Sequence, residues 1–372
     1  MLRFASIFIA SVAATVAAKP PALERLEPDK AADGDKSTLA WYDARLLPVE
    51  GKGWTDTAEF WHRLPARAKG VVRDPVWTLS TNTAGICVRF VTDAPKIAAR
   101  WTVTSSNLAM PHMPATGVSG LDLYVRHEGQ WRWTGAGRPG STSSSEAVLV
   151  DNVPAGTHEY MLYLPLYNGV KSLEIGIPPT AQLFKPAPRA AKPVVVYGTS
   201  ICQGGCASRP GMAHVAILGR RLDVPTINLG FSGNGKMEPE MADLLAELDP
   251  AVYVLDCLPN MTAEMVRERI EPFVRTLRKA HPHTPIVLVE QAPHQAARFL
   301  PSARERVDRK NAELRATFER LSDANVPQLT LVPGDRLLGV DDDATVDGTH
   351  ATDLGFVRMA DELEPVLRKL LK

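Results

Sequence analysis

A serine and a histidine in the C-terminal half of the chain are the residues best suited to nucleophilic chemistry. Ser200 comes just after the apolar run 194–197, and His350 stands three residues after Asp347. A serine hydroxyl becomes an effective nucleophile only when a base takes its proton. An imidazole can be that base, and a carboxylate close to it can bind its Nδ1–H and fix the tautomer. Taken alone, Ser200 could be a helix cap, and Asp347 with His350 could be a surface turn.

Two further loops offer groups that could stabilise a developing negative charge. The loop 231–235 contains Gly233, and its glycines allow backbone N–H groups to turn toward such a charge. Asn260 follows the apolar run 252–255, and its side-chain amide could join those donors. An ordinary turn or a helix cap would explain these residues equally well. The conjunction of all four loops favours a catalytic site.

The elements that must position these loops form an α/β pattern over residues 192–372. Continuous apolar runs at 194–197, 252–255 and 286–289 indicate strands buried on both faces, as in a parallel sheet. Helices are predicted over 213–222, 238–247, 263–280, 303–321 and 354–371. Strands alternating with helices predict a sheet with helices on both faces, a three-layer αβα domain. Its ligands should bind at the carboxyl ends of the strands, where the four loops lie.

The preceding residues, 19–180, are predicted to form an all-β sandwich. Short alternating runs at 86–91, 97–103, 121–125, 147–150, 160–164 and 173–177 suggest strands. Segments 135–140 and 151–156 contain Gly, Pro and Asn and are interpreted as turns. A proline-rich stretch then predicts a linker over residues 181–191.

Together these residues resemble the ordered sequence blocks of the SGNH/GDSL hydrolases. Gly198-Thr199-Ser200, Gly233, Asn260 and the pair Asp347 and His350 carry the resemblance over about residues 190–372. Gly120-Leu121-Asp122-Leu123-Tyr124 resembles the Gly-x-Asp-Leu-Tyr signature of a β-sandwich domain that precedes one subgroup. The resemblance implies a flavodoxin-like αβα domain after a jelly-roll-like sandwich. Thr199, Pro259 and Ala351 depart from the usual residues of these blocks without removing a reacting group.

The resemblance also assigns roles to individual residues. Ser200 would be the nucleophile, His350 the general base and Asp347 the residue that orients it. The backbone N–H groups of Ser200 and Gly233, with the Asn260 amide, would form an oxyanion hole. The implied reaction is ester hydrolysis through an acyl-enzyme, without a metal or organic cofactor.

Besides an SGNH/GDSL esterase, the site has three other interpretations. The α/β-hydrolase architecture requires Gly-x-Ser-x-Gly, and Ser200 is followed by Ile201-Cys202 instead. An acyltransferase would use the same residues with an alcohol in place of water. A carbohydrate-binding protein with an inactive site is disfavoured, because every expected catalytic residue type is present. A small-molecule or polysaccharide ester, such as acetylated carbohydrate, is the preferred substrate class by analogy.

Two further histidines are candidate substrate-binding residues. His294 follows the fourth predicted strand, and His112 lies on a sandwich loop that could reach the substrate if the domains pack closely. A solvated loop residue is an equally good explanation of His294. His214 is expected to serve helix packing.

Four cysteines, Cys87, Cys202, Cys206 and Cys257, could form disulfides in an oxidising compartment. A Cys206–Cys257 bridge would brace two catalytic loops, and Cys202 competes with Cys206 for the same partner. A structural zinc site is not expected, because Cys202 and Cys206 lack further ligands at suitable spacing.

The N-terminus predicts export. A positively charged N-terminal region, an apolar run over 4–16 and Ala17-Ala18 are typical of a secretory signal peptide over residues 1–18. Such a signal predicts that the protein is in the periplasm or outside the cell. The run is too short for a membrane anchor. Lys plus Arg and Asp plus Glu balance at 42 each, which argues against nucleic acid as a partner. The sequence does not indicate an oligomeric state.

Overall fold

The computed structural model describes residues 23–27, 31–32 and 39–372. The signal peptide predicted over residues 1–18 lies outside the described residues. Among the helices of the described part, none combines the length and the apolar character needed to cross a membrane.

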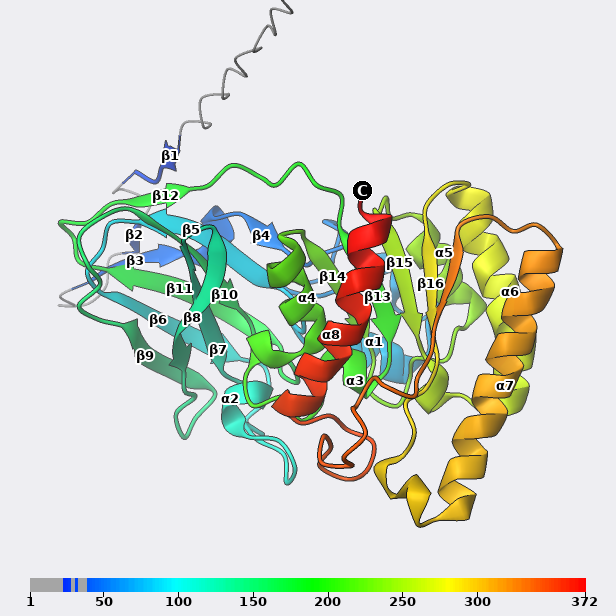
Figure 1. Cartoon of the computed structure of the whole chain (residues 1–372). Coiled ribbons are helices and arrows are strands. Elements are labelled where there is room, and N and C mark those ends of the chain that lie inside the picture. The colour runs from blue at the N-terminus through cyan, green and yellow to red at the C-terminus, as the bar shows by residue number, and fades with distance from the viewer. Residues whose placement is uncertain (1–22, 28–30, 33–38) are drawn as a thin grey trace, which may run out of the picture.

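The N-terminal domain consists of two antiparallel β-sheets, seen at the left of Figure 1. One sheet has the order β1 (Glu24–Arg25), β12 (Leu183–Lys185), β5 (Cys87–Thr92), β10 (His158–Tyr163), β7 (Leu121–His127) and β8 (Gln130–Gly137), with β4 (Val49–Glu50) paired to β5. The other has the order β2 (Ala31–Ala32), β3 (Ala40–Asp43), β11 (Val170–Ile177), β6 (Ile97–Val103) and β9 (Ser144–Val150). Alternate residues such as Phe90, Leu162, Trp101 and Ile175 meet in a buried core. The predicted β-sandwich is confirmed.

Two segments of this domain differ from the sequence prediction. Residues 135–137, interpreted as a turn, continue strand β8. A Cβ at Gly135 would lie 2.0 Å from the carbonyl oxygen of Leu149, so this glycine permits close approach between strands rather than chain reversal. Residues 183–185, placed in the predicted linker, form β12, which pairs with β5.

The C-terminal domain has a five-stranded parallel sheet flanked by helices. The strand order is β14 (Thr226–Gly230), β13 (Val194–Gly198), β15 (Val252–Asp256), β16 (Ile286–Val289) and β17 (Leu329–Val332). This is the flavodoxin-like order 2-1-3-4-5, in which the chain reverses direction across the sheet between β13 and β15. The predicted αβα domain with a parallel sheet is confirmed, and its switch point lies where Ser200 and Asn260 follow their strands.

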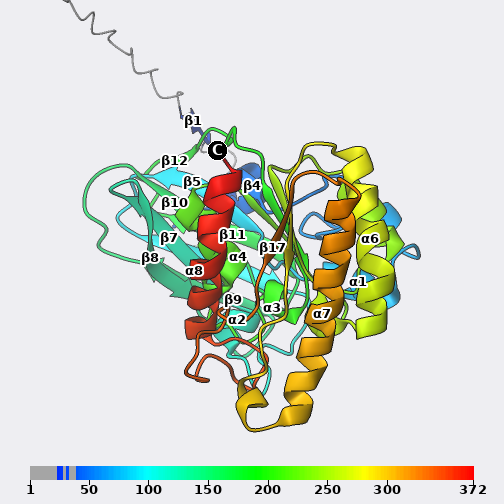
Figure 2. The same cartoon turned by 45° about the vertical axis from the view of Figure 1, so that its right-hand side comes forward.

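Helices cover both faces of this sheet, as two views show (Figures 1 and 2). One face packs against α5 (Pro239–Ala246), α6 (Ala263–Ala280) and α7 (Pro301–Asp323). The other packs against α4 (His214–Leu222) and α8 (Asp353–Leu370). The short helix α3 (Ser200–Gln203) follows β13 directly. Successive strand residues alternate between the two cores, with Val195 and Tyr197 in one and Val194 and Val196 in the other.

Part of the N-terminal region, between Trp54 and Val76, packs on the C-terminal domain instead of in the sandwich, and we call it the crossing segment. Trp54, Leu64, Val72 and Val76, the last within α1 (Asp74–Ser80), lie in the same buried core as the α5 and α6 side chains. The Trp54 indole also donates a hydrogen bond to a carboxylate of the C-terminal domain. This crossing differs from the sequence prediction, which assigned the whole of residues 19–180 to a sandwich.

The Gly-x-Asp-Leu-Tyr signature lies at the contact between the two domains, near α2 (Ala115–Val118). The fully buried carboxylate of Asp122 accepts bonds from the Arg209 guanidinium at 2.7 Å and from the Gly211 N–H at 2.8 Å. Tyr124 also accepts a bond from Arg209. Because a buried carboxylate without partners is strongly unfavourable, these bonds hold the two domains in one arrangement.

Candidate active site

Ser200 is the first residue of α3, immediately beyond the carboxyl end of β13. Thr199 is the N-cap of this helix, and its hydroxyl accepts a bond from the Ile201 N–H at 3.3 Å. Capping is therefore done by the preceding residue, which leaves the Ser200 hydroxyl available. The Ser200 Oγ lies 2.8 Å from the His350 Nε2, within reach for proton transfer.

Asp347 holds the opposite side of the His350 ring. Its Oδ2 lies 2.7 Å from the His350 Nδ1, and its Oδ1 accepts the backbone N–H groups of His350 at 2.8 Å and Thr349 at 3.0 Å. The turn 347–350 thus fixes the carboxylate through its own backbone. Partial burial acts to raise the pKa of Asp347, but the bonds from His350 and Thr349 outweigh it and lower that pKa to about 2. The carboxylate is ionised at neutral pH and can stabilise a charged imidazole.

The three donors predicted for an oxyanion hole lie on loops around this serine. The backbone N–H groups of Ser200 and Gly233 and the side-chain amide nitrogen of Asn260 have no hydrogen-bond acceptor within the described parts of the chain. Gly233 has a φ of +69° and open space where a side chain would project. The Asn260 oxygen accepts the Gly235 N–H at 3.2 Å, which fixes the orientation of its amide. Unsatisfied donors close to a nucleophile are the arrangement that stabilises a tetrahedral oxyanion.

Sequence reasoning missed three residues that support these loops. Gln203 accepts the Ser232 N–H at 2.9 Å and donates to the Leu166 carbonyl at 3.1 Å, so it joins α3, the Gly233 loop and the sandwich domain. Tyr167, also from the sandwich, donates to the Ser200 carbonyl at 3.2 Å. These residues act on backbone groups, which leave no spacing pattern in a sequence.

Arg63 is the third of these residues and is fully buried. Its guanidinium donates to the carbonyls of Asn228 at 3.1 Å and Gly230 at 2.8 Å, at the end of β14. It also donates to Leu79 and Asn82 of the N-terminal region. The strand that leads into the Gly233 loop is therefore held by a residue of the crossing segment.

The two candidate substrate-binding histidines lie next to the predicted catalytic loops. The ring centroid of His112, on an exposed sandwich loop, is 6.1 Å from that of His350. His294 packs against Gly348, and its Nδ1 accepts the Ala296 N–H at 3.1 Å at the start of η6 (Gln295–Arg298). His112 therefore lies beside the His350 ring, and His294 borders the turn that carries Asp347.

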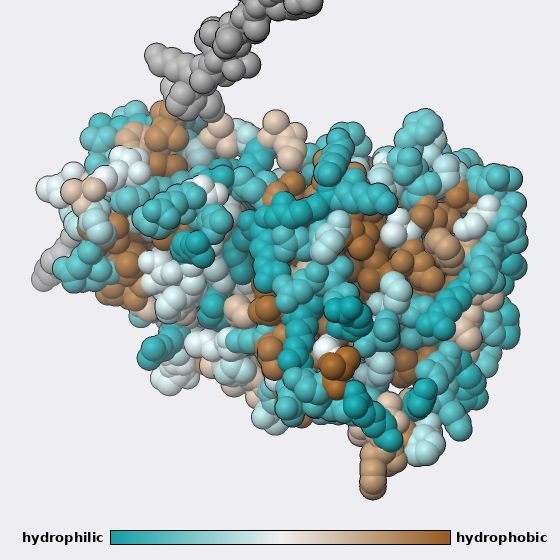
Figure 3. Space-filling view, viewed as in Figure 1, coloured by the Kyte–Doolittle hydropathy of each residue, from teal (hydrophilic) through white to brown (hydrophobic). Residues whose placement is uncertain are grey.

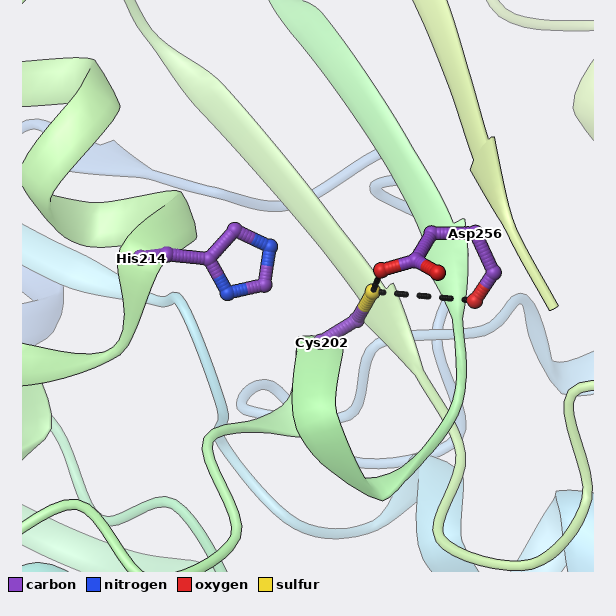
Figure 4. A group of neighbouring side chains, drawn as sticks. All are labelled: Cys202, His214 and Asp256. Atoms are coloured by element: carbon purple, nitrogen blue, oxygen red, sulfur yellow. Dashed lines mark hydrogen bonds between the residues drawn. The ribbon is translucent and has the colours of Figure 1, made fainter. Parts of the chain in front are cut away.

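A buried polar cluster of Cys202, His214 and Asp256 lies close to the end of β13, where Cys202 and Asp256 pack against Gly198 (Figure 4). The Cys202 thiol lies 3.4 Å from the Asp256 Oδ2, and the His214 ring faces them from α4. Burial raises the pKa of Asp256 to about 6 and lowers the pKa of His214 to about 4. His214 also stacks on Phe356 of α8, as expected of a helix-packing residue. Both ionisable groups are thereby pushed toward their neutral forms.

The proposed disulfide between Cys206 and Cys257 is wrong. All four cysteines are free and buried. Cys257 packs in the core beneath α5 and α6, with its sulfur 3.6 Å from the Tyr197 carbonyl, whereas Cys206 lies in the loop after α3, close enough to Asp347 for that charge to affect its pKa. Cys202, the competing partner, belongs to the core on the opposite face of the sheet from Cys257.

A cavity of about 410 Å³ adjoins these loops. Pro259 and Met261, on either side of Asn260, form part of its wall together with Thr349 and His294. The rest of the wall comes from the start of α6, from Gln291 and from the arginine-rich side of α7. Figure 3 shows an apolar projection at the lower edge of the molecule, where η6 leads into α7, and Phe299 there is 86% exposed.

Comparison with protein families gives two matches that together cover most of the chain. The model of the GDSL-like lipase/acylhydrolase family matches residues 191–368. A model described as the N-terminus of SGNH-hydrolase-type esterases matches residues 39–183. No curated protein matches the chain.

Solved structures share this two-domain arrangement. A GDSL-like lipase from Bacteroides ovatus is 41% identical with a TM-score of 0.85, over 90% of this chain and 98% of that one. A salicylyl-acyltransferase from a tetracycline biosynthetic pathway is 20% identical with a TM-score of 0.74, over 90% and 98% of the two chains. An acetyl xylan esterase from the rumen bacterium Butyrivibrio proteoclasticus is 11% identical with a TM-score of 0.54, over 90% and 99%. The last two likenesses concern the fold alone.

Proposed function

The chain belongs to the GDSL-like lipase and acylhydrolase family, and we propose that it is a serine esterase that removes acyl groups, acetyl in particular, from carbohydrate. Membership of this family, a hydrolytic esterase family, confirms the resemblance inferred from the sequence blocks. The observation that carries the proposed mechanism is the continuous chain of contacts from the Ser200 Oγ through the His350 ring to Asp347.

The proposed reaction proceeds in two steps. His350 takes the proton of Ser200 while the Oγ attacks the ester carbonyl carbon, and the resulting oxyanion binds the N–H groups of Ser200 and Gly233 and the amide of Asn260. The intermediate collapses, and the alcohol leaves with the proton held by His350. Water then attacks the acyl-enzyme by the same route and releases the carboxylic acid.

Two observations support a carbohydrate ester as the substrate. The site is bordered by polar groups of both domains, including the exposed His112 and the half-buried His294. Carbohydrate esterases, one solved with cellohexaose and another named as an acetyl xylan esterase, share the fold.

Ester hydrolysis is tested with p-nitrophenyl acetate and with acetylated xylo-oligosaccharides. We expect a burst of p-nitrophenol and release of acetate by the wild type, and neither by Ser200→Ala. Wild-type protein that folds normally but releases no product from either substrate would contradict the proposal. Transfer of the acyl group to an added sugar, in preference to water, would identify an acyltransferase instead.

Export is a second part of the proposal and concerns residues outside the described range. The apolar run 4–16 followed by Ala17-Ala18 supports cleavage after residue 18. Mass spectrometry of the protein recovered from its native host should find a mature chain that begins at Lys19. Recovery of the intact chain from the cytosol would contradict export.

A further inference from the structure

The cavity beside the active site has an unusual distribution of charge along one wall. Helix α7 contributes Arg306, Arg309 and Lys310 to the lining, opposite the loops that carry Asn260 and His350. The whole chain has no net charge, so a local excess of cations here is not a consequence of composition.

The cations of α7 fall into two groups according to where they point. Outside this cavity, Arg304 pairs with Asp308, Arg315 with Glu290 and Arg320 with Glu271. The three that line the cavity form no ion pair with a carboxylate anywhere in the described residues.

The remaining charges around the cavity do not neutralise these cations. Glu264 is the one carboxylate in the lining. Its own backbone N–H and the Thr262 hydroxyl lower its pKa most, and the charges of Arg267 and Arg309 lower it further, so a single carboxylate offsets part of the charge of three cations. Lys310 donates to the Leu258 carbonyl at 3.1 Å, beside Asn260. Burial and the neighbouring charge of Arg306 together lower the pKa of Lys310 to about 8. The cations therefore repel one another, and a bound anion would relieve that repulsion.

We propose that this cavity is an anion subsite, in which Arg306, Arg309 and Lys310 bind a carboxylate or sulfate group on the carbohydrate part of the ester substrate. The inference rests on the proposed esterase function and narrows its substrate class to acidic saccharides. Pro259 and Met261, which flank Asn260, and Thr349, which precedes His350, line the cavity, so a sugar with its ester at Ser200 would place a neighbouring acidic unit near α7. Arginine suits this role because its planar guanidinium group can donate two parallel hydrogen bonds to the oxygens of a carboxylate or sulfate.

Kinetics with matched substrates test the inference. Acetylated galacturonate oligomers, acetylated sulfated oligosaccharides and acetylated xylo-oligosaccharides carry the same ester beside a carboxylate, a sulfate or no charge. We expect the wild type to have a kcat/KM about tenfold or more higher for at least one acidic substrate than for the neutral one. The acidic substrate with the higher value identifies which anion the subsite takes.

A charge-removing variant and a matched control assign the effect to the cavity. In Arg306→Gln/Arg309→Gln the preference for the acidic substrate should fall about tenfold and become insensitive to salt. Arg304→Gln makes the same change on the same helix outside this cavity and should keep the wild-type preference. Both arginines of the double variant are exposed, so it should fold normally.

Binding without catalysis separates this inference from the proposed function. Calorimetry of Ser200→Ala with trigalacturonate and with xylotriose requires no turnover. Tighter binding of trigalacturonate, weakened by the double arginine change, supports the subsite even if no ester were hydrolysed. The opposite result has three parts: the wild type hydrolyses p-nitrophenyl acetate, its rates for acidic and neutral acetylated saccharides are equal, and Ser200→Ala binds both kinds of saccharide equally. That result would overturn the subsite and leave the esterase function intact.

Discussion

The hydroxyl of Tyr167 donates a hydrogen bond to the carbonyl oxygen of Ser200 at 3.2 Å. Tyr167 belongs to the sandwich domain, and Ser200 opens α3 of the α/β domain. The N-terminal domain therefore reaches the backbone of the proposed nucleophile, in addition to placing His112 beside the catalytic imidazole.

Tyr167→Phe tests this contact. The Ser200 carbonyl also accepts the N–H groups of Gly204 at 3.0 Å and Gly205 at 2.8 Å, so two of three donors remain. We expect kcat for p-nitrophenyl acetate to fall about fivefold, in line with the loss of one net hydrogen bond of about 1 kcal/mol. Tyr163→Phe is the control, because that hydroxyl donates to the Ala216 carbonyl away from the site. An equal loss of kcat in both variants would show a general effect of loosened packing.

Asp347→Asn should lower kcat by about 10²–10⁴-fold, because the amide no longer selects the tautomer that leaves Nε2 free to accept a proton. Asp343→Asn, an exposed carboxylate on the same loop, should leave kcat unchanged. Since the pKa of Asp347 is about 2, this carboxylate remains ionised down to pH 4. Steady-state rates measured from pH 4 to pH 8 provide the check, and a kcat for Asp347→Asn near that of the wild type would exclude the orienting role.

Arg63→Met should lower the free energy of unfolding by about 3 kcal/mol or more, because four carbonyl groups lose a buried charged donor. Activity should fall more than the folded fraction does, since two of these carbonyls fix the end of β14. Arg67→Met removes a nearby arginine that is half exposed and should cost less than about 1 kcal/mol. Urea unfolding and active-site titration measure both effects, and equal stability of the two variants would contradict the proposed support.

Removal of Asp256 or of His214 from the buried cluster with Cys202 should change the pH dependence of the unfolding free energy in opposite directions. The folded pKa of Asp256 is about 6, above its ordinary 3.8, so its contribution to stability is present at low pH and is lost as pH rises from 4 to 6. The folded pKa of His214 is about 4, below its ordinary 6.5, so its contribution grows with pH over 4 to 6.5. In the wild type the two slopes of unfolding free energy against pH nearly cancel between pH 4 and 6.

Asp256→Asn should therefore become more stable, relative to wild type, as pH rises from 4 to 6, and His214→Phe should become less stable. Each slope difference is about 1.4 kcal/mol per pH unit. Urea unfolding at pH 4, 5 and 6 measures it. Parallel curves for all three proteins would show that neither group changes its pKa on folding.

The cysteines should be reduced and unreactive in the folded protein. Burial raises the pKa of Cys206 to about 11 and raises the pKa of the other three thiols further, so little thiolate forms at neutral pH. Thiol titration in denaturant without reductant should find four thiols per chain, and slow reaction in buffer. A count of two would restore a disulfide and contradict the structure.

The sequence predicted the fold class, and it singled out a serine, a histidine and an aspartate that the structure brings together, because both leave local signals. Apolar runs marked β13, β15 and β16, and the spacing of Asp347 to His350 placed a carboxylate and an imidazole on one turn. Arg63, Gln203 and Tyr167 left no such signal, because their partners are backbone groups that only the tertiary fold brings near. The cysteine pairing failed for a related reason: a one-dimensional count does not show which face of a sheet each thiol occupies.

The crossing segment that contains Trp54 and α1 has a consequence for how the chain is assembled. Its apolar side chains are synthesised early, but the core that receives them is completed only when α5 and α6 have been made, more than two hundred residues later. Contacts between such distant parts of a chain form slowly, because a long loop must close before they contribute. The two halves of this protein should therefore depend on each other to complete folding, and a C-terminal fragment cut at the proline-rich stretch would expose the surface that this segment covers.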